Sequence, residues 1–196
     1  MVYSETTGVK FNHVDYLWDD EKAAAYGDDQ VGLFLYRSNI LGADLRITNY
    51  GGGNTSCKTI EKDPLTNEAV EVMWIKGSGG DIGTLNRAGI AGIYVDRLHN
   101  LKNVYGGLED EDRMVGLFNH SIYDLDSKAP SIDTPLHGLL PFAHIDHLHP
   151  DALIAVAAAE NSEQVTKEIW GDTMGWVPWQ RPGLDLGLQL EKCLAD

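Results

Sequence analysis

Two strand-like segments that each adjoin a glycine cluster constrain the fold of this chain more than any other feature. Residues 69–79 read AVEVMWIKGSG, in which β-branched and aromatic residues favour extended backbone and the glycines end it. Residues 46–60 read RITNYGGGNTSCKTI, which predicts a strand, a glycine turn and a second strand. Neighbouring strands of this kind indicate a mixed or antiparallel sheet.

The segments around these strands alternate in type. Residues 19–45 predict one or two helices with glycines as breaks, and Pro150 is tolerated in the first turn of a helix over 150–171. The other expected elements are a strand running into a helix (89–101), a helix (110–125), an N-capped helix closed by Pro141 (129–143) and a short strand (143–149). Without repeats or linkers, this order predicts a single layered α/β domain over residues 1–196.

The charge balance argues against two classes of partner. The chain carries 30 acidic against 15 basic residues, a formal charge of −15. Nucleic acid and anionic membranes bind through cationic patches, so we expect neither as a partner. The longest apolar run, ALIAVAAA, is too short to cross a bilayer, and the N-terminal residues do not resemble a signal peptide. We therefore expect a cytoplasmic protein.

A histidine-rich stretch, HIDHLHP, is the most distinctive chemical feature of the sequence. On a strand, His147 and His149 point to one face and His144 to the other, which suits two imidazoles sharing one metal ion. On a helix the pair would instead be His144 and His147, but Pro150 favours a strand that ends here. Surface or core histidines bonded to backbone groups are the alternative. Zinc needs further ligands beyond two imidazoles.

A second candidate lies upstream, in APSIDTPLHG. Asp133 and His137 lie four residues apart, so on a helix they share one face. Alternatively, Ser131 or Asp133 caps the helix, and both interpretations can hold together.

The glycine clusters GGGNTSCK and IKGSGGDIG match neither the Walker nor the dinucleotide-binding spacing. Glycine loops nevertheless present backbone N–H groups that bind anions. The alternative is a pair of tight hairpin turns.

In this order, the stretches GGGNTS, IKGSG, PSIDTPLH, DHLHPDA and RPGLDLGLQL resemble the class II aldolase/adducin family. The stretch PSIDTPLHGLLPFAHIDHLHPDAL is most similar to the aldolase portion of bifunctional rhamnulose-1-phosphate aldolase/alcohol dehydrogenase proteins. The resemblance implies a three-layer α/β/α domain around a mostly antiparallel sheet, a homotetramer with sites between subunits, and a divalent metal, normally zinc.

The resemblance also implies roles for individual residues. His147 and His149 match the metal ligands, and Asp133 matches an acidic residue that ligates the metal or transfers protons. The residues that match the phosphate-binding positions are Gly53, Asn54, Ser78, Gly79 and Ser131.

Two departures from the family pattern stand out. Asp133 is one methylene shorter than the glutamate often found there, and the family's third histidine follows the stretch resembling RPGLDLGLQL, whereas this sequence ends at Asp196. We therefore expect a domain that lacks its C-terminal part and has no dehydrogenase half.

The resemblance implies a zinc-dependent aldolase that cleaves a phosphorylated sugar, of the L-rhamnulose 1-phosphate type, to dihydroxyacetone phosphate and an aldehyde. Two alternatives remain open. One is a sugar-phosphate epimerase or dehydratase on the same scaffold, and the other is a non-catalytic, adducin-like interaction module.

Overall fold

The computed structural model describes residues 2–3, 10–11, 16–49 and 51–195. The strands are β1 (Val2–Tyr3), β2 (Lys10–Phe11), β3 (Asn54–Lys62), β4 (Ala69–Lys76), β5 (Ile90–Tyr94) and β6 (His144–His147). The α-helices are α1 (Asp20–Ala24), α2 (Gln30–Ala43), α3 (Val95–His99), α4 (Glu111–Leu117), α5 (Thr134–Gly138), α6 (Asp151–Ala157), α7 (Ser162–Trp170) and α8 (Leu184–Ala195). Short 3-10 turns join several of them, including η1 (Ile82–Thr84) and η5 (Phe118–Ser121).

The central sheet has four strands in the order β5-β4-β3-β6, and every neighbouring pair is antiparallel. The predicted antiparallel sheet is therefore confirmed. The strand β6 lies at one edge, paired only with the first half of β3, so its residues are held close to the loop that precedes β3.

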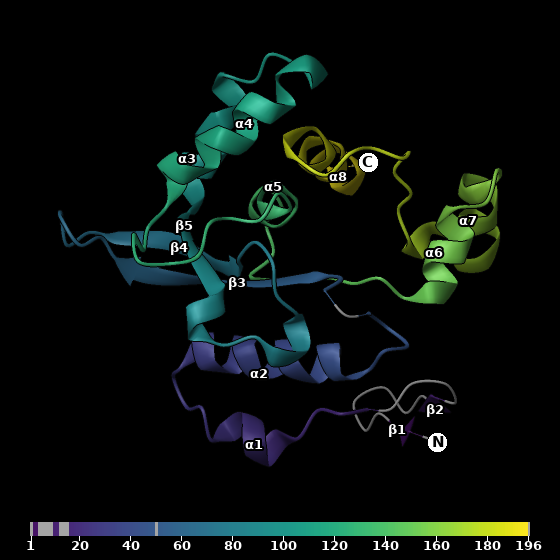
Figure 1. Ribbon diagram of the computed structural model, residues 1–196. Coiled ribbons are helices and arrows are strands. Elements are labelled where there is room, and N and C mark those ends of the chain that lie inside the picture. The colour runs from purple at the N-terminus through teal and green to yellow at the C-terminus, as the bar shows by residue number, and fades with distance from the viewer. Residues whose placement is uncertain (1, 4–9, 12–15, 50, 196) are drawn as a thin grey trace.

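Helices cover both faces of this sheet, which confirms the three-layer α/β/α arrangement (Figure 1). The helix α2 covers one face, where Phe34 packs with Cys57 and Ile90. The opposite face carries α3, α4, α5 and α8, and its core includes Met73, Ile75, Ile93, Leu98, Met114 and Leu184. The alternation of side chains along β4 and β5 supplies both cores.

The predicted helical region 19–45 forms two helices, α1 and α2. Gly27, with φ of +52°, lies in the turn between them, and the Asp29 carboxylate caps α2 by accepting from the Gly32 N–H. No helix among the described residues has both the length and the apolar character needed to cross a bilayer.

The strand predicted at the start of 46–60 is wrong for its described residues. Residues 45–47 form a turn, because the Asp44 carboxylate accepts from the Arg46 N–H at 3.0 Å and the Asp44 carbonyl accepts from Ile47 and Thr48. These local bonds compete with strand pairing. Residue 50 lies outside the described residues.

Three further expectations differ in detail. The helix expected over 110–125 ends at Leu117 as α4, and the chain continues as the 3-10 turn η5 and a β-bridge from Ile122 to Ile93. The helix expected over 150–171 is interrupted between Ala157 and Ser162. Here hydrogen bonds between residues three apart, such as Ala159 N–H to Val156 C=O, form a turn. The helix in 129–143 ends at Gly138, before Pro141.

Candidate metal and phosphate site

The edge strand β6 brings the histidine stretch beside the first glycine loop. In the β3–β6 register Asn54 lies opposite His147, although the two residues are far apart in the sequence. Asn54 is fully buried, and its Oδ1 has no hydrogen-bond partner within the described part of the chain. A buried acceptor without a partner is costly, so this atom is available to a ligand or an ordered water.

The imidazoles of His147 and His149 converge. Their Nε2 atoms lie 2.9 Å apart and their ring centroids 4.8 Å apart. Two nitrogens bound to one zinc ion, each at about 2.0–2.1 Å, lie roughly 3 to 3.5 Å apart, so only a small separation of the rings is needed. Burial lowers the pKa of His147, although the Asp133 carboxylate opposes this effect. The lowered pKa keeps this imidazole neutral at pH 7, and therefore able to bind a metal.

Asp133 lies on the other side of the His147 ring. Its Oδ2 is 4.0 Å from His147 Nδ1, and it accepts from the Ser131 hydroxyl at 3.3 Å and from the Asn54 amide at 3.4 Å. Although Asp133 occupies the N-cap position of α5, its side chain makes no capping hydrogen bond. The capping interpretation of Asp133 is therefore wrong, and its carboxylate is directed to the site instead.

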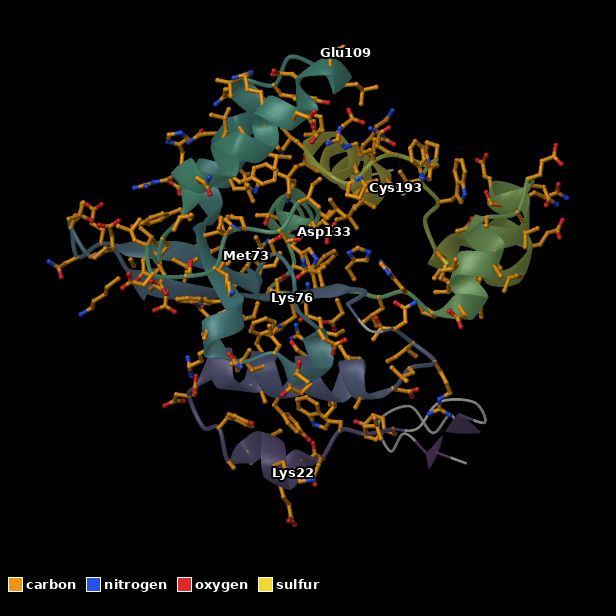
Figure 2. The ribbon with its side chains drawn as sticks, in the orientation of Figure 1. Lys22, Met73, Lys76, Glu109, Asp133 and Cys193 are labelled. Carbon is orange, nitrogen blue, oxygen red and sulfur yellow. The ribbon has the colours of Figure 1, made fainter. Side chains whose placement is uncertain are left out.

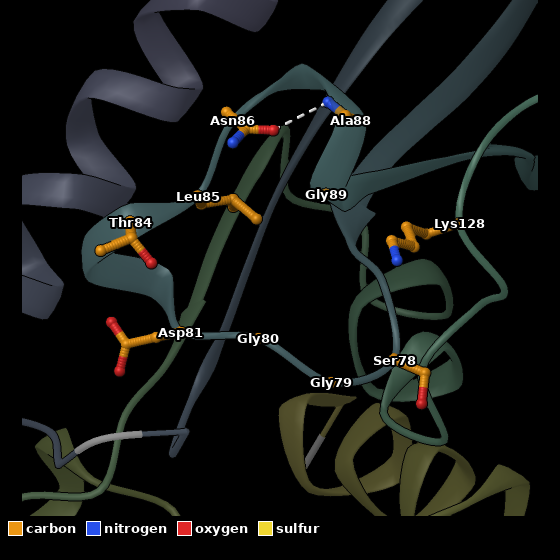
Figure 3. A pocket seen from close by; sticks show the side chains of 10 residues that line it. All are labelled: Ser78, Gly79, Gly80, Asp81, Thr84, Leu85, Asn86, Ala88, Gly89 and Lys128. Carbon is orange, nitrogen blue, oxygen red and sulfur yellow. Dashed lines mark hydrogen bonds between the residues drawn. The ribbon is translucent and has the colours of Figure 1, made fainter.

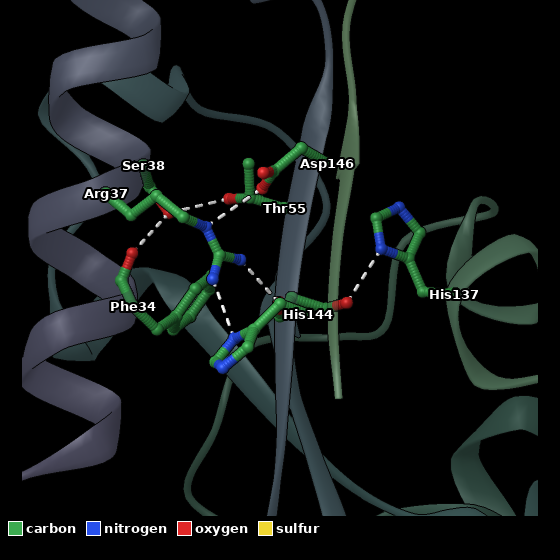
Figure 4. Close-up of polar contacts among 8 residues, drawn as sticks. Phe34, Arg37, Ser38, Thr55, His137, His144 and Asp146 are labelled. Atoms are coloured by element: carbon green, nitrogen blue, oxygen red, sulfur yellow. Dashed lines mark hydrogen bonds and ion pairs between the residues drawn. The ribbon is translucent and has the colours of Figure 1, made fainter. Parts of the chain in front are cut away.

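His144 lies on the opposite face of β6 from His147, as the strand alternation predicts, and Figure 4 shows its ring beside Arg37 of α2. Its Nδ1 lies 2.7 Å from an Arg37 guanidinium nitrogen, and Arg37 also donates to Asp146 at 3.1 Å and to the Ser56 carbonyl at 2.7 Å. Burial and the Arg37 charge lower the pKa of His144. This network anchors β6 to α2 and leaves the opposite face of β6 to His147.

The two glycine loops are tied together and to the Ser131 segment. The Asp81 carboxylate accepts from the Gly51 N–H at 2.9 Å and from the Gly83 N–H at 2.7 Å. The Ser78 N–H donates to the Ala129 carbonyl at 3.0 Å. The first loop precedes β3 and the second leads from β4 into η1, so neither is the tight hairpin turn considered as an alternative.

Ser78 and Gly79 line a cavity of about 460 Å³ beside the second loop (Figure 3). Lys128 and Asp81 also line this cavity. Gly79 and Gly80 have φ of +69° and +99°, backbone conformations that favour glycine. Of the predicted phosphate-binding residues, Gly53, Asn54 and Ser131 therefore lie around the histidines, whereas Ser78 and Gly79 lie on the adjoining loop.

Gly53 controls how closely the first loop approaches β6. It has φ of +74°, and a Cβ there would lie 2.7 Å from the His147 carbonyl oxygen. We expect Gly53→Ala to lower the free energy of unfolding by about 2–4 kcal/mol, from backbone strain and the clash together. Gly51→Ala is the matched control, because Gly51 has φ of +71° with no atom within 4 Å of the added Cβ. Chemical denaturation should show a larger loss for Gly53→Ala, and equal losses would contradict this packing.

His137 is buried behind the rings of His147 and His149 and does not lie beside their two facing Nε2 atoms. Its Nδ1 bonds to the Ser56 hydroxyl at 2.8 Å, and its ring centroid lies 6.4 Å from that of His147. Burial lowers the pKa of His137 to about 3. Its Nε2 has no partner among the described residues.

The donor set fits a divalent ion in part. Neutral His147 and His149 present converging nitrogens, but the described residues contain no group of three His, Cys, Asp or Glu side chains arranged to hold a metal ion. Catalytic zinc sites have three protein ligands and one open position. The two histidines therefore supply two ligands, and other donors must supply the rest.

Sequence reasoning missed one charged residue at this site. Lys76 is the last residue of β4 and is 5% exposed (Figure 2). The only signal in the sequence is its position, at the end of an apolar strand and directly before Gly77 and Ser78.

Comparisons with known proteins agree with this architecture. Residues 35–196 match the family model for the class II aldolase and adducin N-terminal domain. The N-terminal class II aldolase domain of a conserved protein from Thermoplasma acidophilum has the same fold, with a TM-score of 0.80 and 26% identity over 92% of this chain and 81% of that one. The fold thus defines a class II aldolase-type domain. The chain belongs to the class II aldolase/adducin family.

One curated relative is considerably longer. The chain is 39% identical over 183 residues to YuxG of Bacillus subtilis (strain 168), described as an uncharacterized oxidoreductase. The match covers 93% of this chain but only 26% of that protein, so the chain spans about a quarter of its relative.

Proposed function

We propose that this domain is a metal-dependent aldolase that cleaves a ketose 1-phosphate, of the L-rhamnulose 1-phosphate type, to dihydroxyacetone phosphate and an aldehyde such as L-lactaldehyde. Membership of the class II aldolase family supports carbon–carbon lyase chemistry. The observation that carries the proposal is the convergence of His147 and His149 beside Asp133, opposite Asn54 and next to the first glycine loop.

The phosphate of the substrate would be anchored by the polar groups around this pair. Gly53 and Asn54 of the first loop, Ser78 and Gly79 of the second, and Ser131 offer backbone N–H groups, an amide and hydroxyls. Ser131 in the free protein bonds to Asp133, so its hydroxyl changes partner or positions the carboxylate. Anchoring the phosphate fixes the distance between the reacting carbons and the histidines.

Asp133 would transfer the proton. Its carboxylate accepts the proton of the substrate hydroxyl whose carbon becomes the aldehyde, as the carbon–carbon bond breaks. It then returns this proton to the carbon of the three-carbon product, which balances the reaction. Asn54 and Ser131, both within 3.4 Å of Asp133 Oδ2, hold the carboxylate in place.

His147 and His149 would hold the divalent metal, zinc or another. When bound, it supplies Lewis-acid stabilisation of the negative charge that develops on the substrate oxygens. The unprotonated state that burial favours at His147 serves this role, because a protonated imidazole cannot be a ligand.

The lack of a third ligand among the described residues favours one competing function. The described residues contain no three-residue metal cluster. A non-catalytic, adducin-like module is expected to have no such cluster. Retention of the converging histidines argues for the enzyme instead.

The proposal includes a homo-oligomer, with a tetramer the form implied by the family. Leu153 and Ile154 on α6, 36% and 45% exposed, lie directly after the histidine stretch and provide apolar surface for such contacts. Light scattering measures the assembly directly.

A direct test is to incubate the zinc-supplemented protein with L-rhamnulose 1-phosphate and to follow dihydroxyacetone phosphate with a coupled dehydrogenase. We expect product release that a chelator abolishes and added zinc restores. Conversion of the substrate without a three-carbon product would favour an epimerase or dehydratase. No conversion of any sugar phosphate would favour the interaction module.

A further inference from the structure

Three buried polar atoms on the α5 side of the sheet have no hydrogen-bond partner in the part of the chain that the structure describes. They are Asn54 Oδ1, His137 Nε2 and His147 Nδ1. Asn54 and His137 are fully buried, so bulk solvent cannot satisfy these atoms. A buried polar group without a partner is costly, and three of them in one region indicate a shared ligand.

Strand pairing and the helix α5 bring these three side chains together. Asn54 and His147 lie opposite each other on β3 and β6, so their side chains point to the same face of the sheet. His137 reaches this face from α5, where its Nδ1 lies 2.8 Å from the hydroxyl of Ser56, two residues after Asn54 (Figure 4). The three atoms therefore surround one space between the sheet and α5.

The spacing of the two rings suits a single bridging water. The centroids of His137 and His147 are 6.4 Å apart, so no two ring nitrogens reach the distance of about 2.7–3.2 Å that a direct hydrogen bond needs. A buried water typically makes about three hydrogen bonds to groups that lack other partners. One that accepts from His147 Nδ1–H and donates to His137 Nε2 and Asn54 Oδ1 satisfies all three atoms.

We propose that His137 is a positioning residue of the metal site, acting on His147 through one buried water that both share with Asn54. The water holds the proton of His147 on Nδ1, which leaves a free lone pair on the Nε2 atom that faces His149. A hydrogen bond to the second ring nitrogen fixes the orientation of most metal-binding histidines. The inference rests on the histidine ligands of the proposed function and not on its substrate.

Asp133 is the competing acceptor for the same proton. Its Oδ2 lies 4.0 Å from His147 Nδ1, which is beyond hydrogen-bond distance. The same oxygen already accepts from Ser131 and Asn54. A bridging water therefore fits the geometry better, and it leaves the Asp133 carboxylate free to transfer protons.

The tautomer of His147 tests this role without metal or substrate. Nuclear magnetic resonance of the metal-free protein with isotope-labelled histidine shows which ring nitrogen carries the proton. We expect His147 to be protonated on Nδ1 in the original chain and to shift toward Nε2 protonation in His137→Asn. This variant keeps a donor near Ser56 but has no atom at the position of Nε2. Protonation on Nε2 in the original chain, or an unchanged tautomer in His137→Asn, would overturn the proposal.

Zinc affinity, measured by competition with a chromophoric chelator, gives the consequence of this positioning. We expect His137→Asn to bind zinc about ten- to a hundredfold more weakly than the original chain, and His137→Gln to stay within about threefold. The longer glutamine amide reaches the position of Nε2. His99→Asn is the matched control, because His99 also contacts α5 but does so at the Gly138 carbonyl, 3.0 Å away. We expect it to stay within about threefold as well.

The remaining outcomes separate this role from a structural one. Unchanged affinity in His137→Asn, an equal loss in His137→Gln or His99→Asn, or failure of both His137 variants to fold would contradict the proposal. No zinc binding by the original chain would overturn the metal site of the proposed function, and the tautomer measurement would still decide the role of His137. Failure to release dihydroxyacetone phosphate would overturn only the aldolase reaction.

Discussion

Replacement of His147 by alanine is expected to remove the bound metal and to lower the rate of dihydroxyacetone phosphate release by at least about a thousandfold. Loss of one of two converging imidazoles leaves His149 as a single ligand, and Lewis-acid stabilisation contributes several kcal/mol to such a reaction. Elemental analysis of the purified variant gives the zinc content, and the coupled assay gives the rate.

His144→Ala is the matched control for this prediction. His144 lies on the same strand, but its ring faces α2 and contacts Arg37 rather than His149. Its loss should weaken the contact between β6 and α2 while leaving the zinc content unchanged. Unchanged zinc in His147→Ala, or equal zinc loss in both variants, would contradict the assignment of His147 as a ligand.

Replacement of Asp133 by asparagine is expected to lower the cleavage rate by about two to four orders of magnitude while the zinc content stays the same. Asparagine preserves the shape of the side chain and its contacts with Asn54 and Ser131, but it cannot accept the substrate proton. Single-turnover kinetics isolate this chemical step.

Asp126→Asn, at an exposed position that makes no contact with Asp133 or the two histidines, controls for the loss of one negative charge. A fall in zinc content that parallels the fall in rate would show that Asp133 orients His147 instead of transferring protons. The 4.0 Å distance from Asp133 Oδ2 to His147 Nδ1 makes this a concrete rival, because carboxylates often orient metal-binding histidines.

Local patterns in the sequence predicted much of the fold. The strand predicted in residues 69–79 and the strand-to-helix transition predicted in 89–101 are found as β4, β5 and α3. The opposite orientations of His144 and His147 also follow from strand geometry alone. The single-domain organisation remains an interpretation of the uninterrupted sequence.

The errors arose where one side chain overrides a local pattern. Arg46 and Ile47 look like the start of a strand, but the Asp44 carboxylate and carbonyl bind the backbone N–H groups that follow and form a turn. Asp133 has the composition and position of a capping residue, yet its side chain turns to Asn54 and Ser131, which lie near it only in the folded chain.

The site itself was only partly predictable. Nothing in the spacing reveals that Asn54 lies opposite His147, because strand pairing between distant segments is set by the whole sheet. The same holds for Lys76, since a lysine at a strand end is normally exposed and its burial depends on segments remote in sequence. The metal role of His147 and the phosphate role of Asn54 remain predictions.

The most direct measurement is the zinc X-ray absorption spectrum of the zinc-loaded protein. If the converging imidazoles of His147 and His149 are the ligands, the spectrum contains scattering from two imidazoles with zinc–nitrogen distances of about 2.0–2.1 Å. A spectrum dominated by sulfur from Cys57 or Cys193, or by oxygen ligands without imidazole scattering, would contradict the account.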